Sequence, residues 1–439
     1  CRVVADFPDP NQPLPLFVAD IQLFDDAGQT VAEVDSLRFQ QVDPRALGGP
    51  RYDQWLYQLD WEARPRLQEG AEQLAGPGQL TAALASATHQ ATAECHFYRA
   101  LWSAMDELAV RYVSQALSQL GWRPQSGDIF TTSELVATLG VVADFRELFQ
   151  RCLAMLAEDG ILTRLERERW RVEQSQLAAP DIAALRTQFP AAHPELTLVE
   201  RCSTALASVW QGTTDPLQLL FPAGDMEVTT QLYQQAVGAR VINNLLGQAV
   251  QTALAPLPAT QGIRILEIGG GTGGTTVRLL PLLSAQRCDY LFTDISAHFT
   301  RHAEGQFAAD YPFVRYGVLD IEKDPPADWL GQFDIIVAAN VLHATQDLGA
   351  TLDHCAQLLA PGGQLVLLEA SARQRWLDLT FGMTDGWWRF TGHDPLRADY
   401  PLLTPAQWQT VLPDHGFAEV AVLGPDQDGA ALQQHVVAV

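Results

Sequence analysis

The chain has 439 residues, of which 47% are hydrophobic and 18% are charged, and its formal net charge is −24. This length predicts two or three domains, and the composition is typical of globular rather than disordered chains. The acidic excess argues against nucleic acid as a partner, and no apolar run approaches the roughly 20 residues of a membrane helix.

The chain begins without Met and without a charged-then-apolar signal segment, which indicates a piece of a longer polypeptide. The six cysteines are scattered and form no C-x-x-C pair. We therefore expect a cytoplasmic protein with reduced thiols and no zinc site.

Residues 1–45 have the pattern of β structure. Phe17–Phe24 and Val31–Phe39 alternate apolar with polar residues, and residues 25–29 are typical of a turn. Two strands cannot bury a core, so we expect them to belong to a larger sheet. Residues 46–79 are interpreted as a linker that contains a short strand at Trp55–Trp61.

Residues 80–255 are helical in pattern. Apolar residues recur at three- and four-residue steps from Phe97 to Leu120, which predicts one buried helical face. Further helices are expected at Asp144–Leu156 and Leu232–Leu254, with a turn into a strand at Gly160. Because such stripes usually form core, we assign no chemistry to them.

Residues 256–439 alternate strands with helices. Five parallel strands followed by an antiparallel pair predict a doubly wound α/β sheet. Four of the five parallel strands are assigned to the apolar segments Arg264–Ile268, Tyr290–Thr293, Asp334–Ala338 and Gln364–Glu369, and the antiparallel pair to Ala418–Leu423 and His435–Val439.

A glycine loop joins the first of these strands to a helix. Gly269, Gly271 and Gly273 allow a tight turn and a close ligand approach. The same residues fit the dinucleotide fingerprint, with Asp294 about 20 residues beyond the last glycine. A glycine-rich turn without a ligand is a third reading of the loop.

Glu267, two residues before Gly269, favours a cationic cofactor over a dinucleotide. A carboxylate there would repel a pyrophosphate and attract a cation. S-adenosylmethionine carries a sulfonium and an ammonium and has no phosphate, so it is the cofactor we expect.

His343 and Glu369 end the fourth and fifth parallel strands. Neighbouring strands lie about 4.8 Å apart and ligands bind at their carboxyl ends, so the two side chains can meet over the cofactor. A carboxylate beside an imidazole produces a general base, which suits removal of a proton from carbon without a metal. The alternative is a helix-starting histidine and a solvent-facing glutamate.

A run of large apolar groups follows the fifth strand, from Phe381 to Phe390. Phe381, Trp387 and Trp388 are candidates for the lining of an acyl tunnel. Plain packing of a helix against a lid explains them equally well.

These motifs together resemble the C-methyltransferase domain of polyketide synthases, over roughly residues 80–439. The segments that carry the resemblance are Ile265–Thr276, Phe292–Ser296, Leu319–Asp324, Ala338–Thr345, Pro361–Gly363, Phe381–Phe390 and Pro401–Leu403, with Leu219–Pro222, Tyr233, Asn243 and Asn244 similar to the lid of that family. Gly270 departs from it, since we expect alanine at this place in the loop. Residues 1–45 resemble the final strands of a dehydratase domain, and residues 46–79 its linker.

The resemblance implies a class I, Rossmann-like methyltransferase core (residues 256–439) beneath a helical lid subdomain (80–255). It implies that S-adenosylmethionine binds with its ribose at Asp294 and its adenine at Asp320, with Ile295, Ile321 and Asn340 completing the site.

The substrate implied is a β-ketoacyl thioester on the phosphopantetheine arm of an acyl carrier protein, among neighbouring synthase domains. His343 would take the α proton, and Glu369 would orient it. Tyr233 would reach the substrate or cofactor from the lid, or would be an ordinary core tyrosine.

Two rival functions remain. A nicotinamide-dependent reductase could use the same glycine loop, although the Tyr-x-x-x-Lys pattern of ketoreductases is absent after the fourth strand. An inactive methyltransferase-like scaffold is the other.

Overall fold

The computed structural model describes residues 2–4, 17–24, 30–39, 73–166, 168–175, 178–392, 394–424 and 432–439. The chain forms two compact units, Cys1–Ala63 and Arg64–Val439. Within the described residues, no helix is long and apolar enough to cross a membrane.

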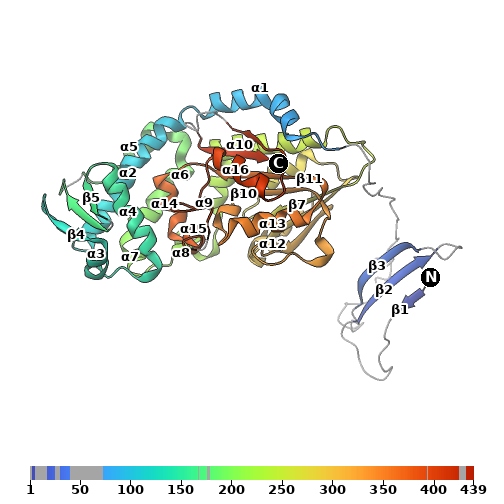
Figure 1. Ribbon diagram of the computed structural model, residues 1–439, viewed down its shortest axis with the longest axis horizontal. Helices are drawn as coiled ribbons and strands as arrows, with labels where there is room; N and C mark the ends of the chain where they lie inside the picture. Colours follow the sequence, from blue (N-terminus) through green and yellow to red (C-terminus); the bar gives the residue numbers. More distant parts are fainter. Residues whose placement is uncertain are drawn as a thin grey trace, which may run out of the picture. The chain divides into compact units, whose positions relative to one another are not determined.

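The first unit contains an antiparallel sheet in the order β1-β2-β3. Its strands are β1 (Arg2–Val4), β2 (Phe17–Phe24) and β3 (Thr30–Phe39) (Figure 1). The two expected strands are therefore confirmed, and Phe17 pairs with Phe39. The expected turn at 25–29 and the strand at 55–61 lie outside the described residues, and the resemblance to a dehydratase stays a prediction.

The second unit is built on a seven-stranded mixed sheet in the order β12-β13-β11-β10-β7-β8-β9. The five strands β7 to β11 run parallel, and β13 joins β11 and β12 antiparallel, as the sequence predicts. The strands are β7 (Ile263–Ile268), β8 (Cys288–Asp294), β9 (Val314–Val318), β10 (Phe333–Ala339), β11 (Leu359–Ala370), β12 (Ala421–Leu423) and β13 (Gln434–Ala438).

Both faces of this sheet are covered, which explains its continuously apolar strands. Successive side chains of a strand point to opposite faces, so Ile265 joins one hydrophobic core and Leu266 the other. Helices α10 (Val237–Leu254), α11 (Thr276–Leu279) and α12 (Ala297–Phe307) pack in the first core, and α13 (Leu348–Leu358) and α16 (Pro405–Asp414) pack in the second.

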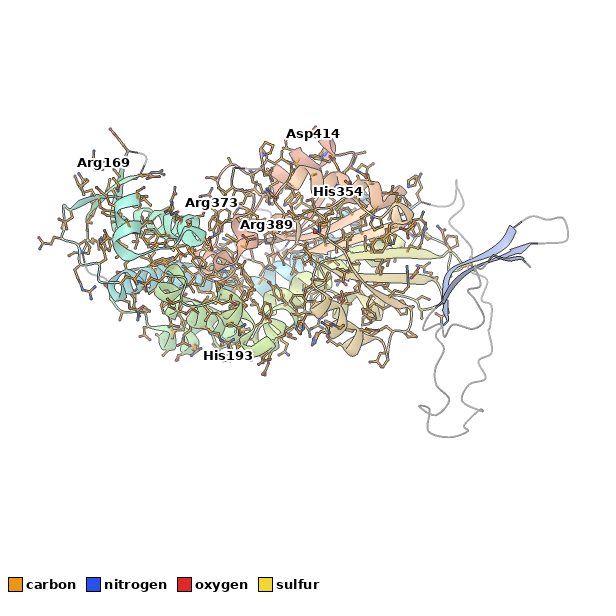
Figure 2. The ribbon with its side chains drawn as sticks, turned by 90° about the horizontal axis from the view of Figure 1, so that it is seen from below. Arg169, His193, His354, Arg373, Arg389 and Asp414 are labelled. Carbon is orange, nitrogen blue, oxygen red and sulfur yellow. The ribbon has the colours of Figure 1, made fainter. Side chains whose placement is uncertain are left out.

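The helical region precedes the sheet in the chain and joins the same core as α10. It also holds a small sheet in the order β4-β6-β5, of which the sequence predicted only the strand after Gly160. Its elements are α1 (Pro77–Cys95), α2 (Tyr98–Gln119), β4 (Ile129–Thr131), α3 (Thr132–Leu139), α4 (Arg146–Glu158), β5 (Leu162–Glu166), β6 (Arg169–Val172), α5 (Ile182–Gln188), α6 (His193–Thr204), α7 (Leu206–Trp210), α8 (Pro216–Leu220) and α9 (Glu227–Thr230). Figure 2 shows Arg169 and His193 of this region at the periphery, where both are exposed.

The helix expected at Leu232–Leu254 begins later, at Val237. Residues Gln231–Gln235 form a π-helical turn (η6), and Ala236 is extended with ψ 142°. π-Helical turns recur at functional sites, and this one carries Tyr233.

One buried and one more exposed ion pair join the helical region to the segment after β11. Arg151 of α4 donates to Asp378 of α14 (Arg375–Asp378) at 2.8 Å, and the Tyr400 hydroxyl donates to the other oxygen of Asp378 at 2.9 Å. Arg375 pairs with Asp159 at 2.6 Å. Because a buried charge without its partner is strongly destabilising, the Arg151–Asp378 pair holds the helical region against the sheet domain.

Candidate active site

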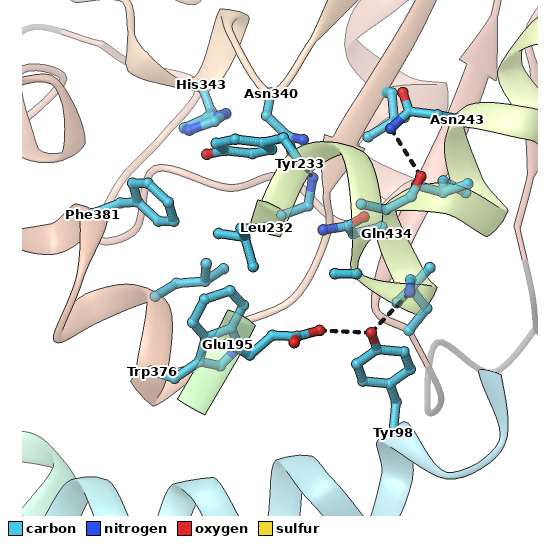
Figure 3. Close-up of a pocket in the computed structure, with 18 of the residues that line it drawn as sticks. Tyr98, Glu195, Leu232, Tyr233, Asn243, Asn340, His343, Trp376, Phe381 and Gln434 are labelled. Atoms are coloured by element: carbon cyan, nitrogen blue, oxygen red, sulfur yellow. Dashed lines mark hydrogen bonds between the residues drawn. The ribbon is translucent and has the colours of Figure 1, made fainter. Parts of the chain in front are cut away.

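Two cavities meet at the carboxyl ends of the parallel strands. The glycine-loop cavity has a volume of about 490 Å³ and is bordered by the loop after β7. The aromatic cavity has a volume of about 220 Å³ and extends from His343 into the helical region (Figure 3). The residues that line both cavities are Tyr233, Asn243, Asn340, Ala344, Phe381, Thr384 and Gly386.

The glycine loop has the backbone conformation that its sequence predicts. Gly269 and Gly271 line the glycine-loop cavity with φ of 63° and 53°, in the left-handed region that favours glycine. Gly273 has φ 75° but does not line either cavity; a Cβ there would lie 2.8 Å from the Phe307 ring. Gly273 thus serves the packing of the loop against α12.

Glu267 lies at the floor of the glycine-loop cavity and is only 1% exposed. Its Oε2 accepts hydrogen bonds from Thr276 and Tyr290, both at 2.7 Å. Burial raises the pKa of Glu267 to about 7, against the effect of these two donors. The carboxyl therefore changes charge near neutral pH.

The expected ribose and adenine acids line the same cavity. Asp294 accepts from the backbone N–H of Gly271 at 3.0 Å and of Ser296 at 2.8 Å, so it shapes the loop as well as lining the cavity. Burial raises the pKa of Asp294. Asp320 is more open and pairs with Lys323 at 2.9 Å.

The chemistry of the lining suits a cationic nucleoside better than a pyrophosphate. The carboxylates that line the glycine-loop cavity are Glu267, Asp294, Asp320 and Glu322. Arg389 is the guanidinium among the described lining residues, and it is already paired with Glu322 at 2.8 Å. Ile295 and Ile321 line the same cavity, and Ile295 is 60% exposed.

His343 and Glu369 form a hydrogen-bonded pair. His343 lies in the short helix η9 (Leu342–Ala344) after β10, and its Nδ1 donates to Glu369 Oε2 at 2.6 Å. Glu369 Oε1 accepts from the N–H groups of Val341 and Leu342 at 3.1 and 2.9 Å. The carboxylate is thus fixed, and the pairing leaves Nε2 of His343 as the nitrogen with a lone pair.

Arg397 supports this pair and was missed by sequence reasoning. Its guanidinium donates to the carbonyls of His343 and Thr345, both at 2.6 Å, while its Nε pairs with Asp394. Arg397 is only 2% exposed. No local pattern marks it, because it lies 54 residues from His343 in the chain.

The expected substrate residues divide into two groups. Phe381 and Trp387 line the aromatic cavity, and the Trp387 ring stands edge-on to His343 at 5.5 Å. Trp388 lines neither cavity; its Nε1 donates to the Gly382 carbonyl at 2.7 Å, so it packs rather than contacts a ligand.

Tyr233 and Asn340 stand where the two cavities join. Tyr233 lies 6.0 Å from Phe381, ring to ring, and burial raises its pKa, with the charge of Glu369 adding to the effect. Asn340 has the left-handed φ of 54°, and its Oδ1 accepts from the N–H of Ala370 at 3.1 Å. A non-glycine residue in this conformation is uncommon and recurs at functional sites.

Comparison with known proteins bears directly on this site. A family model described as a methyltransferase domain matches residues 266–365. The crystal structure of the CurJ carbon methyltransferase is 42% identical, with a TM-score of 0.79 over 83% of this chain and 99% of that one. The chain belongs to the carbon methyltransferase domains of polyketide synthases.

Other relatives agree with this membership. The DszA carbon methyltransferase is 29% identical, with a TM-score of 0.74 over 84% of this chain and 98% of that one. Polyketide synthase ThaG of Burkholderia thailandensis is 36% identical over 307 residues, which are 69% of this chain and 5% of that protein. Non-reducing polyketide synthase dpfgA of Gibberella zeae is 32% identical over 350 residues, 75% of this chain and 16% of that protein.

This carbon methyltransferase domain therefore spans between 5% and 16% of these two curated relatives. The family membership sets aside the alternative of a nicotinamide-dependent reductase. It also confirms the α/β methyltransferase fold that the sequence predicted.

Gly270, the departure noted in the sequence, has a structural reason. A Cβ at this position would overlap the buried ring of Phe292. We expect Gly270→Ala to lower the free energy of unfolding by about 1–3 kcal/mol through overpacking. Urea unfolding measures this change.

The control for this prediction is Gly305→Ala, since a Cβ on that helical glycine meets nothing within 4 Å and should be neutral or slightly stabilising. Phe292→Leu in the Gly270→Ala background should recover part of the loss. A Gly270→Ala protein as stable as the wild type would contradict the proposed clash.

Proposed function

We propose that this domain transfers a methyl group from S-adenosylmethionine to the α carbon of a β-ketoacyl thioester carried by an acyl carrier protein. The observation that carries the proposal is the hydrogen-bonded pair of His343 and Glu369, in which His343 lines the aromatic cavity and its neighbour Ala344 lines both cavities. Neighbouring synthase domains would supply and receive the carrier.

The glycine-loop cavity would hold the cofactor, because its acids match a cation and a ribose diol. Glu267 would face the charged end, Asp294 the ribose and Asp320 the adenine amine, with Ile295 and Ile321 against the ring. S-adenosylmethionine, when bound, supplies an electrophilic methyl group on a sulfonium. Gly269 and Gly271 let the backbone approach it closely.

The aromatic cavity would hold the acyl chain with its α carbon beside His343. Nε2 of His343 accepts the α proton, and the β-keto and thioester carbonyls spread the negative charge left on carbon. Glu369 keeps Nδ1 protonated and stabilises the imidazolium that results. The carbon deprotonated by His343 would then be placed to receive the methyl group that S-adenosylmethionine would supply, with the thioether S-adenosylhomocysteine as the by-product.

Tyr233, Phe381 and Trp387 would exclude water and hold the acyl chain, and Asn340 would sit where chain and cofactor meet. The proposal is tested by mass spectrometry of a β-ketoacyl carrier protein incubated with the chain and S-adenosylmethionine. We expect a gain of one methyl group on the α carbon. Cofactor binding without any methyl gain would indicate the inactive scaffold instead.

The raised pKa of Glu267 leads to a separate prediction, that the affinity for S-adenosylmethionine depends on pH. With a pKa of about 7, Glu267 is partly protonated in the free protein near neutral pH. A bound cation favours the ionised carboxylate, so affinity for S-adenosylmethionine should rise about threefold to tenfold between about pH 6 and pH 8, with release of a proton. Isothermal titration calorimetry in buffers of different ionisation enthalpy measures both quantities.

Glu267→Gln is the matched control, because it keeps the shape and cannot ionise. Its affinity should change little over the same range. An equal rise in the variant would show that another group is responsible.

A further inference from the structure

The deep end of the aromatic cavity carries a polar pair in apolar surroundings. Figure 3 shows Tyr98 and Glu195 at one end of this cavity, with His343 and Asn340 at the other. Trp102 of α2 and Trp376 of α14 stack at 5.6 Å and line the same end. Nothing in the proposed methyl transfer uses this polar pair.

Glu195 lies in the first turn of α6, and only one of its two carboxyl oxygens has a hydrogen-bond partner among the described residues. The Tyr98 hydroxyl donates to Oε1 at 2.7 Å. Oε2 is buried and has no hydrogen-bond partner among the described residues, and Glu195 as a whole is only 3% exposed. A buried polar atom of this kind normally has a partner, so Oε2 points to a ligand group.

Tyr98 has no freedom to rearrange. Its hydroxyl accepts from the backbone N–H of Gly238 at 2.8 Å and therefore gives its own hydrogen to Glu195. Burial raises the pKa of Glu195, and the hydrogen bond from Tyr98 lowers it. Because Oε1 already accepts from Tyr98, Oε2 is the oxygen left to accept a hydrogen bond from a hydroxyl group in the cavity.

The group that reaches Glu195 belongs to the free end of the chain. The lining residues Tyr98, Trp102 and Trp376 are buried, whereas His343, Ala344 and Thr384 are partly exposed. A tethered thioester must keep its carrier at the surface, so it enters with the acyl end first.

We propose that Glu195, held by Tyr98, binds a hydroxyl group on the acyl chain beyond its β-carbonyl. The inference rests on the proposed function, since it takes the acyl chain as the occupant of the aromatic cavity. It makes Glu195 a specificity-determining residue, because a site built to hydrogen-bond a substrate oxygen rejects the chain that lacks it.

The test compares β-ketoacyl pantetheine thioesters of equal length that differ only in a hydroxyl at the fifth or seventh carbon. Isothermal titration calorimetry gives the Kd of each for the full chain, and methyl transfer is followed in the same samples. We expect one hydroxylated chain to bind at least about tenfold more tightly than its deoxy partner.

Two variants of Glu195 distinguish a loss of hydroxyl recognition from a general loss of folding. Glu195→Gln keeps Oε1 as the acceptor for Tyr98 and turns an amide N–H toward the cavity, so the preference should persist. Glu195→Leu removes the hydrogen-bonding group, and the two chains should then bind equally, with the deoxy chain bound as well as by the wild type.

The inference is overturned if the wild type has no preference for either hydroxyl, or if Glu195→Leu keeps it. It is also overturned if Glu195→Leu weakens both chains equally and N-acetylcysteamine thioesters escape that effect, because Glu195 would then bind the pantetheine arm. If the hydroxylated chain binds more tightly but no methyl group is transferred, only the proposed function is contradicted. The experiment therefore distinguishes a failure of the proposed function from a failure of the inference about Glu195.

Discussion

His343→Ala is expected to lower the rate of methyl transfer by about 10²–10⁴-fold, the range for loss of a general base. The variant removes the Nε2 lone pair beside the aromatic cavity, so the α proton has no acceptor. Single-turnover mass spectrometry of the β-ketoacyl carrier protein measures the effect.

Affinity for S-adenosylmethionine should be unchanged in His343→Ala, because His343 does not line the glycine-loop cavity. His415→Ala is the matched control; that histidine pairs with Asp353 outside both cavities, so methyl transfer should stay at the wild-type rate. Full activity of His343→Ala would remove the proposed base.

Glu369→Gln is expected to lower the rate by a similar factor while leaving the shape of the site intact. Glu369 Oε1 accepts from the N–H groups of Val341 and Leu342, so the amide oxygen must stay there and the amide nitrogen must face His343. Nδ1 would then have to accept, and the ring hydrogen would move to Nε2. In a serine protease triad the corresponding exchange lowers kcat about 10⁴-fold for this reason.

The double variant His343→Ala/Glu369→Gln distinguishes this positioning role from an independent one. If Glu369 acts only through His343, the double variant should be no slower than His343→Ala alone. Rate losses that multiply would show that Glu369 has a separate function. Thermal unfolding of Glu369→Gln checks that the backbone around Leu342 is retained.

Arg397 explains why the His343 loop keeps its place without substrate. Its two bonds to the carbonyls of His343 and Thr345 fix the backbone on either side of Ala344. Because the loop is already ordered, substrate binding does not have to bear the entropy cost of ordering it. The contact also connects the segment after β11 to the carboxyl end of β10.

The helical region contributes to the site as much as the sheet does. Tyr233 reaches the junction of the cavities from η6, and Tyr98 and Glu195 close the deep end from α2 and α6. The buried pair of Arg151 and Asp378 ties these helices to the sheet domain. The aromatic cavity therefore exists only in the assembled unit.

Much of the sheet domain was predictable because its signals are local. Apolar strands, a glycine loop directly after one of them, and polar residues at strand ends follow from short stretches of chain. His343 and Glu369 are 26 positions apart in the chain. A single crossover connects the adjacent parallel strands at whose carboxyl ends they lie, so topology alone brings the two residues together. The start of α10 was predicted too early, because periodicity does not register the extended Ala236.

By itself the sequence determined the α/β class, the position of the glycine loop and the His343–Glu369 pair. The tertiary structure alone decided that Gly273 and Trp388 pack outside the cavities, that Phe292 requires glycine at position 270, and that Glu195 keeps an oxygen without a partner. The reason is physical: these properties depend on side chains that meet from distant segments, such as Tyr98 and Glu195, 97 residues apart. Residue spacing predicts which face a side chain takes, but only packing decides what it meets there.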